Sequence, residues 1–332
     1  MNTINVVRDA LATYESEMLD GFGLYNGKMG LIMTYFLASS ILSEEKYADK
    51  AKILIEELSS AIGDIQDMSF DNGLAGIGYG IEWIVQNGYL HVDTDEILAD
   101  FDDQMYRNTL FSRSDNLSLS NGTLSKAMYF YKRILSENLS TLRYRKLCNQ
   151  ECMLLLLQEI NEKLADDQFG LFHKESLNEN DVYNIAQTLT FITNLINSKF
   201  NNDLSKQIIC LISSFSNKYL NHEFNHQTQN SDSDLYLIYS CIKAGKILKD
   251  PYILDIGKKS LDKYLIRKED KSTTLYLETY LLFKISLLTG ESENIKYNRS
   301  QQLNKPGIFN LISSVNALEE CSYQNWDEAW GF

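Results

Sequence analysis

A pair of histidines four positions apart is the first feature that could support chemistry. Residues 222–226 read His-Glu-Phe-Asn-His, a spacing that on a helix brings two imidazoles to one face. In a zinc peptidase, His222 and His226 would bind the metal and Glu223 would act as the base. The amphipathic segment before the motif is expected to end at Leu220 and a polar stretch follows, so the sequence context favours an ordinary surface pair of histidines.

Two carboxylates could support a different reaction. A carbohydrate-active helical protein needs two opposed acids across its cavity, and Asp71 and Asp234 are the candidates. Asp234 has a structural interpretation as well, because Asp often caps a helix and an apolar segment starts at Leu235. Asp232 and Asp234 together would suit a hard cation better than zinc.

Three Asn-Gly steps recur in the first half of the chain, at Asn26-Gly27, Asn72-Gly73 and Asn121-Gly122. Each is followed by small residues and then by an apolar segment. We expect the glycines of these loops to supply positive φ. Gly76, Gly78 and Gly80 are expected to let neighbouring helices approach closely.

In the second half of the chain, apolar segments continue to recur behind polar loops, but without the Asn-Gly steps. Together the two halves predict seven apolar helices that start near residues 26, 72, 121, 183, 234, 274 and 307. Amphipathic segments with a 3.6-residue period lie between them. These are residues 4–19, 44–62, 94–110, 142–164, 204–220 and 252–265, and a polar seventh element near 292–302.

This alternation predicts an all-α protein of seven helical hairpins. A helix that is apolar on nearly all sides must be buried, whereas an amphipathic helix has one face in water. A closed double ring, the seven-fold α/α toroid, satisfies both, and an open solenoid of stacked helix pairs is the alternative. No linker interrupts the series, so residues 1–332 are predicted to form a single domain.

The loops before the apolar helices are predicted to rim a central cavity. Aromatic and amide side chains there suit recognition of a peptide or a sugar. The candidate binding residues are Tyr25, Asn26, Lys28, Asp71, Asn72, Asn121, Tyr183, Asn184, Asp234, Tyr236, Tyr276 and Glu278. We expect Tyr236→Ala and Asn72→Ala to weaken ligand binding with little change in stability. Trp326 and Trp330 indicate that the C-terminal tail docks on the first units.

The segments GLYNGKMG at residues 23–30 and LAGIGYG at 74–80, with the ending WDEAWGF at 326–332, resemble the lanthionine synthetase C-like (LanC-like) family. The resemblance implies a seven-fold double ring of helices. It also implies a protein that closes thioether rings in dehydrated peptide precursors, with zinc holding the peptide thiol as thiolate.

The residues that carry this chemistry in the family are missing here. The resemblance places a Cys at the start of the fifth inner helix and a Cys-His pair at the sixth, where this chain has residues 231–236 and 271–275 without Cys or His. Tyr183-Asn184 stands where a general-acid histidine is expected, and 118–120 lacks the expected aspartate. Because zinc needs thiolate or imidazole ligands, the sequence predicts no zinc, no other cofactor and no assigned catalytic residue.

Charge and cysteine content restrict the partners. A formal net charge of −14 argues against nucleic acid and against an anionic membrane surface. No apolar run is long enough to span a bilayer. The five cysteines have no disulfide spacing, which predicts a reduced, cytoplasmic protein.

The predicted function is therefore a LanC-like protein of a ribosomal-peptide maturation pathway. It would bind a precursor peptide, or a partner modification enzyme, without zinc-dependent cyclisation. The alternatives are an α/α-toroid enzyme of different chemistry, such as a glycoside hydrolase, and the zinc peptidase described above.

Overall fold

The computed structural model describes residues 8–9, 11–12, 21–25, 27–138, 143–198, 200, 203–225, 231–268, 276–290, 312 and 325–332. Within these ranges the regular elements are helices, and the β-type pairing is one isolated bridge between Gly21 and Gly27. None of the helices described here is long and apolar enough to cross a membrane.

The apolar helices form where the sequence predicts them. They are α2 (Lys28–Leu42), α4 (Leu74–Gln86), α7 (Thr123–Ile134), α9 (Glu179–Asn197), α11 (Asp232–Ile247) and α13 (Tyr276–Thr289). In α11, the residues from Ser233 to Ile242 are all buried, as expected for a helix surrounded by protein. The predicted seventh helix, at 307–318, lies outside the described residues except for Ile312.

The amphipathic helices alternate with the apolar ones. They are α3 (Glu45–Ala61), α6 (Ala99–Phe111), α8 (Arg143–Ala165), α10 (Asp203–Asn225) and α12 (Pro251–Lys268), with the short α5 (Thr94–Ile97) before α6. Along α3 the buried positions are Tyr47, Ala51, Leu54 and Leu58, a spacing of three and four residues. One face of α3 is therefore packed, and its glutamates lie on the other.

Two boundaries differ from the prediction. The segment expected as one helix over 94–110 breaks at Leu98, because Asp93 caps a separate first turn by accepting a hydrogen bond from the Asp95 amide. The helix expected to end at Leu220 continues to Asn225. Its last turn is polar, so the periodic apolar signal stops before the helix does.

The glycines of the Asn-Gly steps do not have positive φ. Gly27, Gly73 and Gly122 are the N-caps of α2, α4 and α7, with φ of −126°, −116° and −99°. The prediction that these glycines supply positive φ is therefore wrong. A small residue is required there because neighbouring backbone packs closely against it. A Cβ on Gly73 would collide with the carbonyl oxygen of Asp67, and one on Gly122 with the backbone nitrogen of Ser118.

The chain divides into two compact units, and the division falls inside α8. Unit 1 comprises residues 1–156 and 299–330, and unit 2 comprises 157–298 and 331–332. The single domain over 1–332 remains a prediction.

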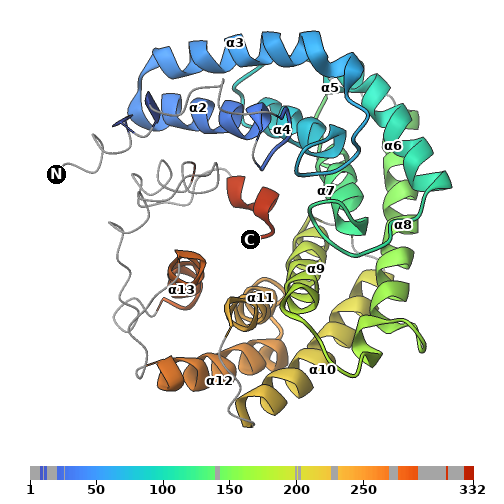
Figure 1. Ribbon diagram of the computed structural model, residues 1–332, viewed down its shortest axis with the longest axis vertical. Coiled ribbons are helices and arrows are strands. Elements are labelled where there is room, and N and C mark those ends of the chain that lie inside the picture. The colour runs from blue at the N-terminus through green and yellow to red at the C-terminus, as the bar shows by residue number, and fades with distance from the viewer. Residues whose placement is uncertain are drawn as a thin grey trace. The chain divides into compact units, whose positions relative to one another are not determined.

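In unit 1, α3 lies along α2, and α4 packs against both α2 and α7 (Figure 1). The helix pairs thus follow one another in chain order. The tail contributes a 3₁₀ helix, η5 (Trp326–Trp330), whose Trp326 is 1% exposed.

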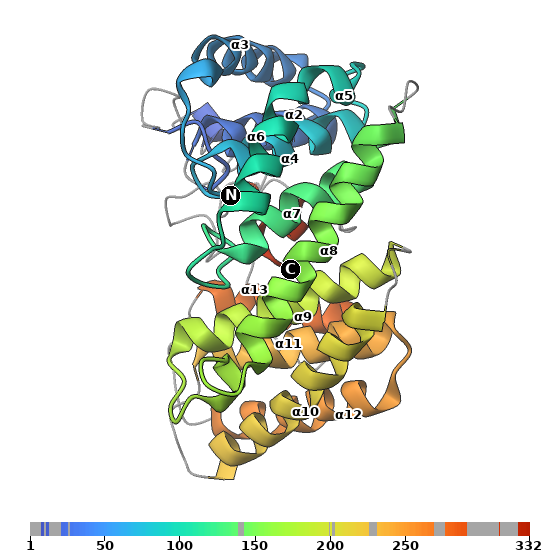
Figure 2. The ribbon, with the colours of Figure 1, turned by 90° about the vertical axis from the view of Figure 1, so that its right-hand side faces the viewer.

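In unit 2, α11 packs against α9, α12 and α13, and α10 packs against α9 and α12 (Figure 2). Gly245 of α11 lies so close to the backbone of Leu254 in α12 that a Cβ would not fit. Thr190 donates to Ser240 over 3.0 Å and links α9 to α11.

Candidate functional site

The loops before α2, α4 and α7 are joined by hydrogen bonds in unit 1. The amide of Tyr25 donates to the carbonyl of Asp71 (3.1 Å), and the amide of Phe70 donates to the carbonyl of Ser120 (2.7 Å). The Ser120 hydroxyl donates to the Asp71 carboxylate over 2.5 Å. Two of the predicted rim residues, Tyr25 and Asp71, are therefore brought together.

The other predicted rim residues of unit 1 have different surroundings. Asn72 and Asn121 are exposed on the same loops. Lys28 forms an ion pair with Glu57 of α3, with 2.6 Å between Nζ and the carboxylate oxygen. Asn26 lies outside the described residues.

Tyr25 is covered by the C-terminal tail. Its hydroxyl donates to the carbonyl of Ala329 over 3.1 Å, and its ring stacks on Trp330 with 5.8 Å between the centroids. Burial, and secondarily the nearby Asp71 carboxylate, raise the pKa of the Tyr25 phenol well above its usual value. The phenol is therefore neutral and occupied by protein atoms. The predicted docking of the tail on the first helices is present here.

In unit 2, the predicted acid Asp234 lies in the first turn of α11. The N-cap is Ser231, whose hydroxyl accepts from the Asp234 amide, while the Asp234 carboxylate accepts from the Ser231 amide. The prediction that Asp234 is the N-cap is therefore wrong. The N-cap is Ser231, three residues earlier, and Asp234 is its partner in the capping box. Asp234 also accepts from the Tyr219 hydroxyl over 3.0 Å.

Further acids and phenols surround this helix start. Glu278 of α13 is 5% exposed and accepts from the Tyr264 hydroxyl over 2.9 Å. Burial first, then Glu278, raise the pKa of Tyr264. Burial also raises the pKa of Tyr183, with Asp232 contributing.

The remaining predicted residues of unit 2 vary in accessibility. Tyr183 and Asn184 are half-buried at the start of α9, and the side chain of Tyr276 lies outside the described residues. Tyr236 is only 1% exposed and donates to the carbonyl of Gly331 over 2.5 Å. The expectation that Tyr236→Ala leaves stability unchanged is therefore wrong.

The donor set at the start of α11 does not fit the zinc site of the resemblance. Residues 231–236 offer hydroxyls and carboxylates but no thiolate or imidazole, and two of these side chains, Ser231 and Asp234, are engaged in the helix cap. Over the residues with assigned positions, no three His, Cys, Asp or Glu side chains lie together as a metal site. The sixth helix start, at 271–275, is outside them.

The histidine motif is partly described. His222 lies on α10 and is exposed. The helix continues to Asn225, beyond the end expected at Leu220, but His226 and the side chain of Glu223 are outside the described residues. The other two histidines, His91 and His173, are exposed.

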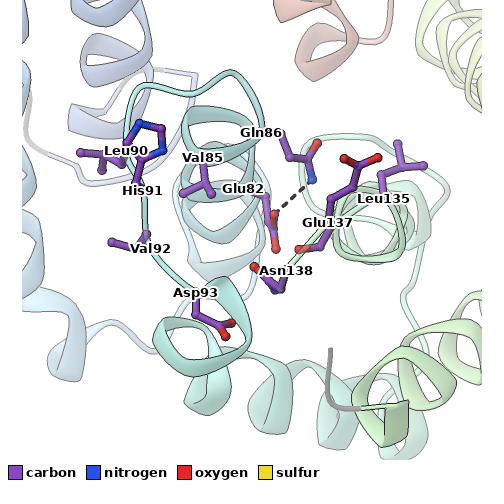
Figure 3. Close-up of a pocket in the computed structure, with 11 residues that line it drawn as sticks. Glu82, Val85, Gln86, Leu90, His91, Val92, Asp93, Leu135, Glu137 and Asn138 are labelled. Atoms are coloured by element: carbon purple, nitrogen blue, oxygen red, sulfur yellow. Dashed lines mark hydrogen bonds between the residues drawn. The ribbon is translucent and has the colours of Figure 1, made fainter. Parts of the chain in front are cut away.

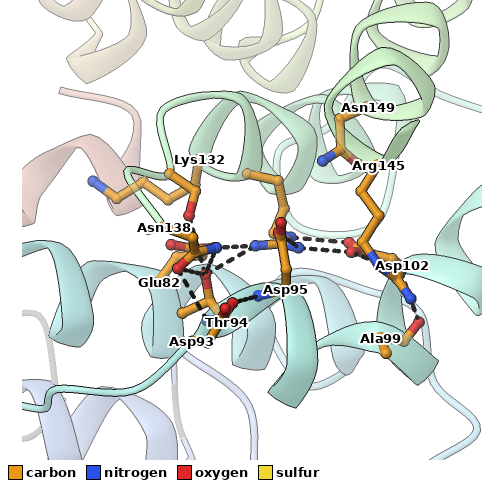
Figure 4. Close-up of polar contacts among 12 residues, drawn as sticks. Glu82, Asp93, Thr94, Asp95, Ala99, Asp102, Lys132, Asn138, Arg145 and Asn149 are labelled. Carbon is orange, nitrogen blue, oxygen red and sulfur yellow. Dashed lines mark hydrogen bonds and ion pairs between the residues drawn. The ribbon is translucent and has the colours of Figure 1, made fainter. Parts of the chain in front are cut away.

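A buried charge network in unit 1 was not foreseen from the sequence. The Arg133 guanidinium donates to both oxygens of Asp102 (2.9 and 2.7 Å), to Asp95 (2.9 Å) and to Glu82 (Figure 4). The side chains of Arg133, Glu82 and Asp102 are at most 1% exposed. Glu82 is the one charged residue in the apolar α4 and was the available signal, but its pairing with Arg133 of α7 depends on tertiary structure.

Comparison with known proteins agrees with this architecture. The profile of the family described as lanthionine synthetase C-like protein matches residues 19–184. Among solved structures, nisin cyclase aligns with a TM-score of 0.63 and 13% sequence identity, over 99% of this chain and 96% of that chain. A search of curated protein sequences found no match.

The fold is therefore an all-α toroid of the kind seen in nisin cyclase. Since the family profile covers half of the sequence, the chain belongs to the lanthionine synthetase C-like family. The predictions of fold class and family are confirmed.

Proposed function

We propose that this protein binds a precursor peptide in a ribosomal-peptide maturation pathway and does not itself close thioether rings. Membership of the lanthionine synthetase C-like family supports the peptide pathway. One observation supports the absence of ring closure: at the start of α11, where the family resemblance places a zinc ligand, Ser231 and Asp234 form a helix cap.

Thioether closure by the family's route requires a thiolate held at neutral pH. A thiol with an ordinary pKa near 8.5 is mostly protonated there, and a zinc ion or a base must shift it. Ser231 and Asp234 offer oxygen atoms, which are not soft ligands. Both side chains are also occupied, because each bonds the backbone of the other. The protein would then present the peptide to a modification enzyme or sequester it, as a binding member without the family's activity.

The exposed amides of unit 1 are the accessible part of the proposed binding surface. Asn72 and Asn121 lie on loops whose backbones are fixed to each other through Ser120. A rigid loop loses little entropy when a peptide docks, which favours affinity. The net charge of −14 favours a peptide with basic character. The reduced, cytoplasmic setting is part of this proposal.

Glycoside hydrolysis is not favoured by the two candidate acids. Asp71 accepts a short hydrogen bond from Ser120, and Asp234 is held in a capping box and by Tyr219. Both carboxylates are thus engaged by protein groups, whereas glycoside hydrolysis needs two acids that face the scissile bond.

The experiment is calorimetric titration of the full chain with a precursor peptide encoded beside its gene. Asn72→Ala and Asn121→Ala are expected to weaken binding, and Gln158→Ala, an exposed amide on the outer helix α8, is the matched control. Equal affinity in all three variants and the parent would refute the assignment of these loops. No binding by the parent would refute the proposal.

A further inference from the structure

A cavity of about 720 Å³ lies in unit 1 beside the buried charge network. It is formed where α4 and α7 end, between the loop that follows each helix. Figure 3 shows Glu82, Val85 and Gln86 on α4, with the loop carrying Leu90 to Asp93 on one side and the loop carrying Leu135 to Asn138 on the other. None of the predicted rim residues lines it.

The walls of this cavity are fixed by side-chain hydrogen bonds. Thr94, at the end of the first loop, bonds Asn138 of the second loop. The backbone amide of Thr94 donates to the side-chain oxygen of Asn138 (3.1 Å), and the side-chain nitrogen of Asn138 donates to the Thr94 hydroxyl (2.9 Å). Ser136 shares a 3.0 Å bond with the same hydroxyl. The cavity is therefore preformed, as binding sites for small groups usually are.

On the α4 side of the cavity, the side chain of Gln86 is held in place by two hydrogen bonds. Its side-chain nitrogen donates to Glu82 (3.1 Å) and to the carbonyl of Lys132 in α7 (3.1 Å). Glu82 is in turn held by Arg133. The buried network thus sets the position of the α4 side chains that face the cavity.

The polar lining is suited to a cation. Its ionisable side chains are Glu82, Asp93, Glu137 and His91, and no Lys or Arg is among the lining residues. Glu82 is bonded by Arg133 and Asp93 caps α5, so the exposed carboxylate of Glu137 supplies the accessible negative charge at the opening. The C-terminal ends of α4 and α7 add partial negative charge at the same place.

The apolar lining is suited to a methylene chain. Val85, Leu90, Val92 and Leu135 supply it. Lysine and arginine side chains bury an aliphatic stem along such walls and keep the charged end in a polar, wetter region. A small metal ion would leave the apolar walls uncovered, and an anion would meet the carboxylates.

We propose that this cavity receives a lysine or arginine side chain of a peptide that the protein recognises. The proposal rests on the peptide-binding function above and assigns a specificity-determining subsite to it. It places recognition of the basic residue on α4, α7 and their following loops, away from the Asn-Gly loops.

The test uses the full chain and two probe peptides, acetyl-Gly-Leu-Lys-Leu-Gly-amide and the same peptide with Gln at the centre. Titrations followed by amide NMR are expected to shift the signals of Gln86, His91 and Glu137 with the lysine probe. The glutamine probe should bind about tenfold more weakly, because it lacks the charge. High salt should weaken only the lysine probe.

Variants separate the cavity from the general acidity of the surface. Glu137→Gln should weaken the lysine probe about two- to fivefold, as for a solvent-accessible ion pair. Glu56→Gln removes the same charge from an exposed position on α3 and should change nothing. Val92→Trp, at a position 41% exposed, should fill the cavity and abolish the shifts without disturbing the core.

Three results would overturn the inference: equal affinity for the two probes, equal effects of Glu137→Gln and Glu56→Gln, or binding of the lysine probe that survives Val92→Trp in a folded variant. If the precursor peptide binds but the lysine probe does not, this inference fails and the proposed function stands. If the lysine probe binds as expected but the precursor does not, the proposed function fails alone.

Discussion

Replacing Arg133 is the sharpest test of the packing in unit 1. The side chain is fully buried and bonds four groups, namely Glu82, Thr94, Asp95 and Asp102. Arg133→Met keeps most of the volume but removes every donor. Glu82, at 1% exposure, then loses the guanidinium that pairs with it, while the fully buried Asp102 retains Arg145 (3.3 Å) and the Tyr129 hydroxyl (2.7 Å).

The expected loss is about 3–5 kcal/mol of unfolding free energy, the cost of breaking a buried ion pair on one side. Arg133→Lys keeps the charge but cannot bond both oxygens of Asp102 and reach Glu82 as well, so about 1–3 kcal/mol should still be lost. Because the group is buried, neither value should change with salt. Arg107→Met, at an exposed site on α6, is the control and should stay within about 0.5 kcal/mol of the parent.

The assay is urea unfolding followed by tryptophan fluorescence. All three tryptophans, Trp83, Trp326 and Trp330, belong to unit 1, so the signal reports the unit that carries the network. If Arg133→Met unfolds within about 1 kcal/mol of the parent, the network does not stabilise unit 1 and the reasoning is refuted.

Three further changes have defined outcomes. Trp326→Ala should lose about 3–5 kcal/mol in the same assay, because a fully buried indole is truncated, and an unchanged midpoint would show that the tail does not dock. Tyr236→Phe should lose about 1–2 kcal/mol by circular dichroism, because the Gly331 carbonyl loses its donor; a neutral effect would contradict this bond. Burial raises the pKa of the Cys241 thiol from 9.0 to about 12, so the folded state keeps a proton that the unfolded chain releases. The protonated Cys241 thiol therefore contributes fully to the free energy of unfolding below pH 9, and this contribution is lost as the pH rises toward 12. Cys241→Ala should make the fall in stability over this pH range less steep. Iodoacetamide should label the exposed Cys210 and spare Cys241 in the native protein; equal labelling would refute the burial.

Most of the helical architecture was predictable because it depends on local periodicity. A helix buried on nearly all sides has a continuous apolar stretch, as α2 and α11 have in their middle turns, and an amphipathic partner shows its face in the spacing of residues such as Leu54 and Leu58. The break at Leu98 was not predictable. The short helix before it, α5, is capped by Asp93, and its Asp95 bonds Arg133, a partner 38 positions away that no local pattern indicates.

The candidate site was predictable only in part. Tyr25 and Asp71 come together because both precede buried helices that pack as neighbours. The burial of Tyr236 depends on Gly331 and Phe332, which lie far along the chain and carry no local signal at position 236. The cavity between the loops after α4 and α7 arises from tertiary pairing of Thr94 with Asn138, which no spacing rule indicates.

The central claim is that this family member binds a precursor peptide without closing thioether rings. The direct measurement is incubation of the zinc-supplemented full chain with the dehydrated precursor, followed by thiol alkylation and mass spectrometry. The account predicts that every precursor cysteine remains open to alkylation while calorimetry shows binding. Loss of alkylatable thiols at unchanged peptide mass, together with stoichiometric zinc in the protein, would contradict it.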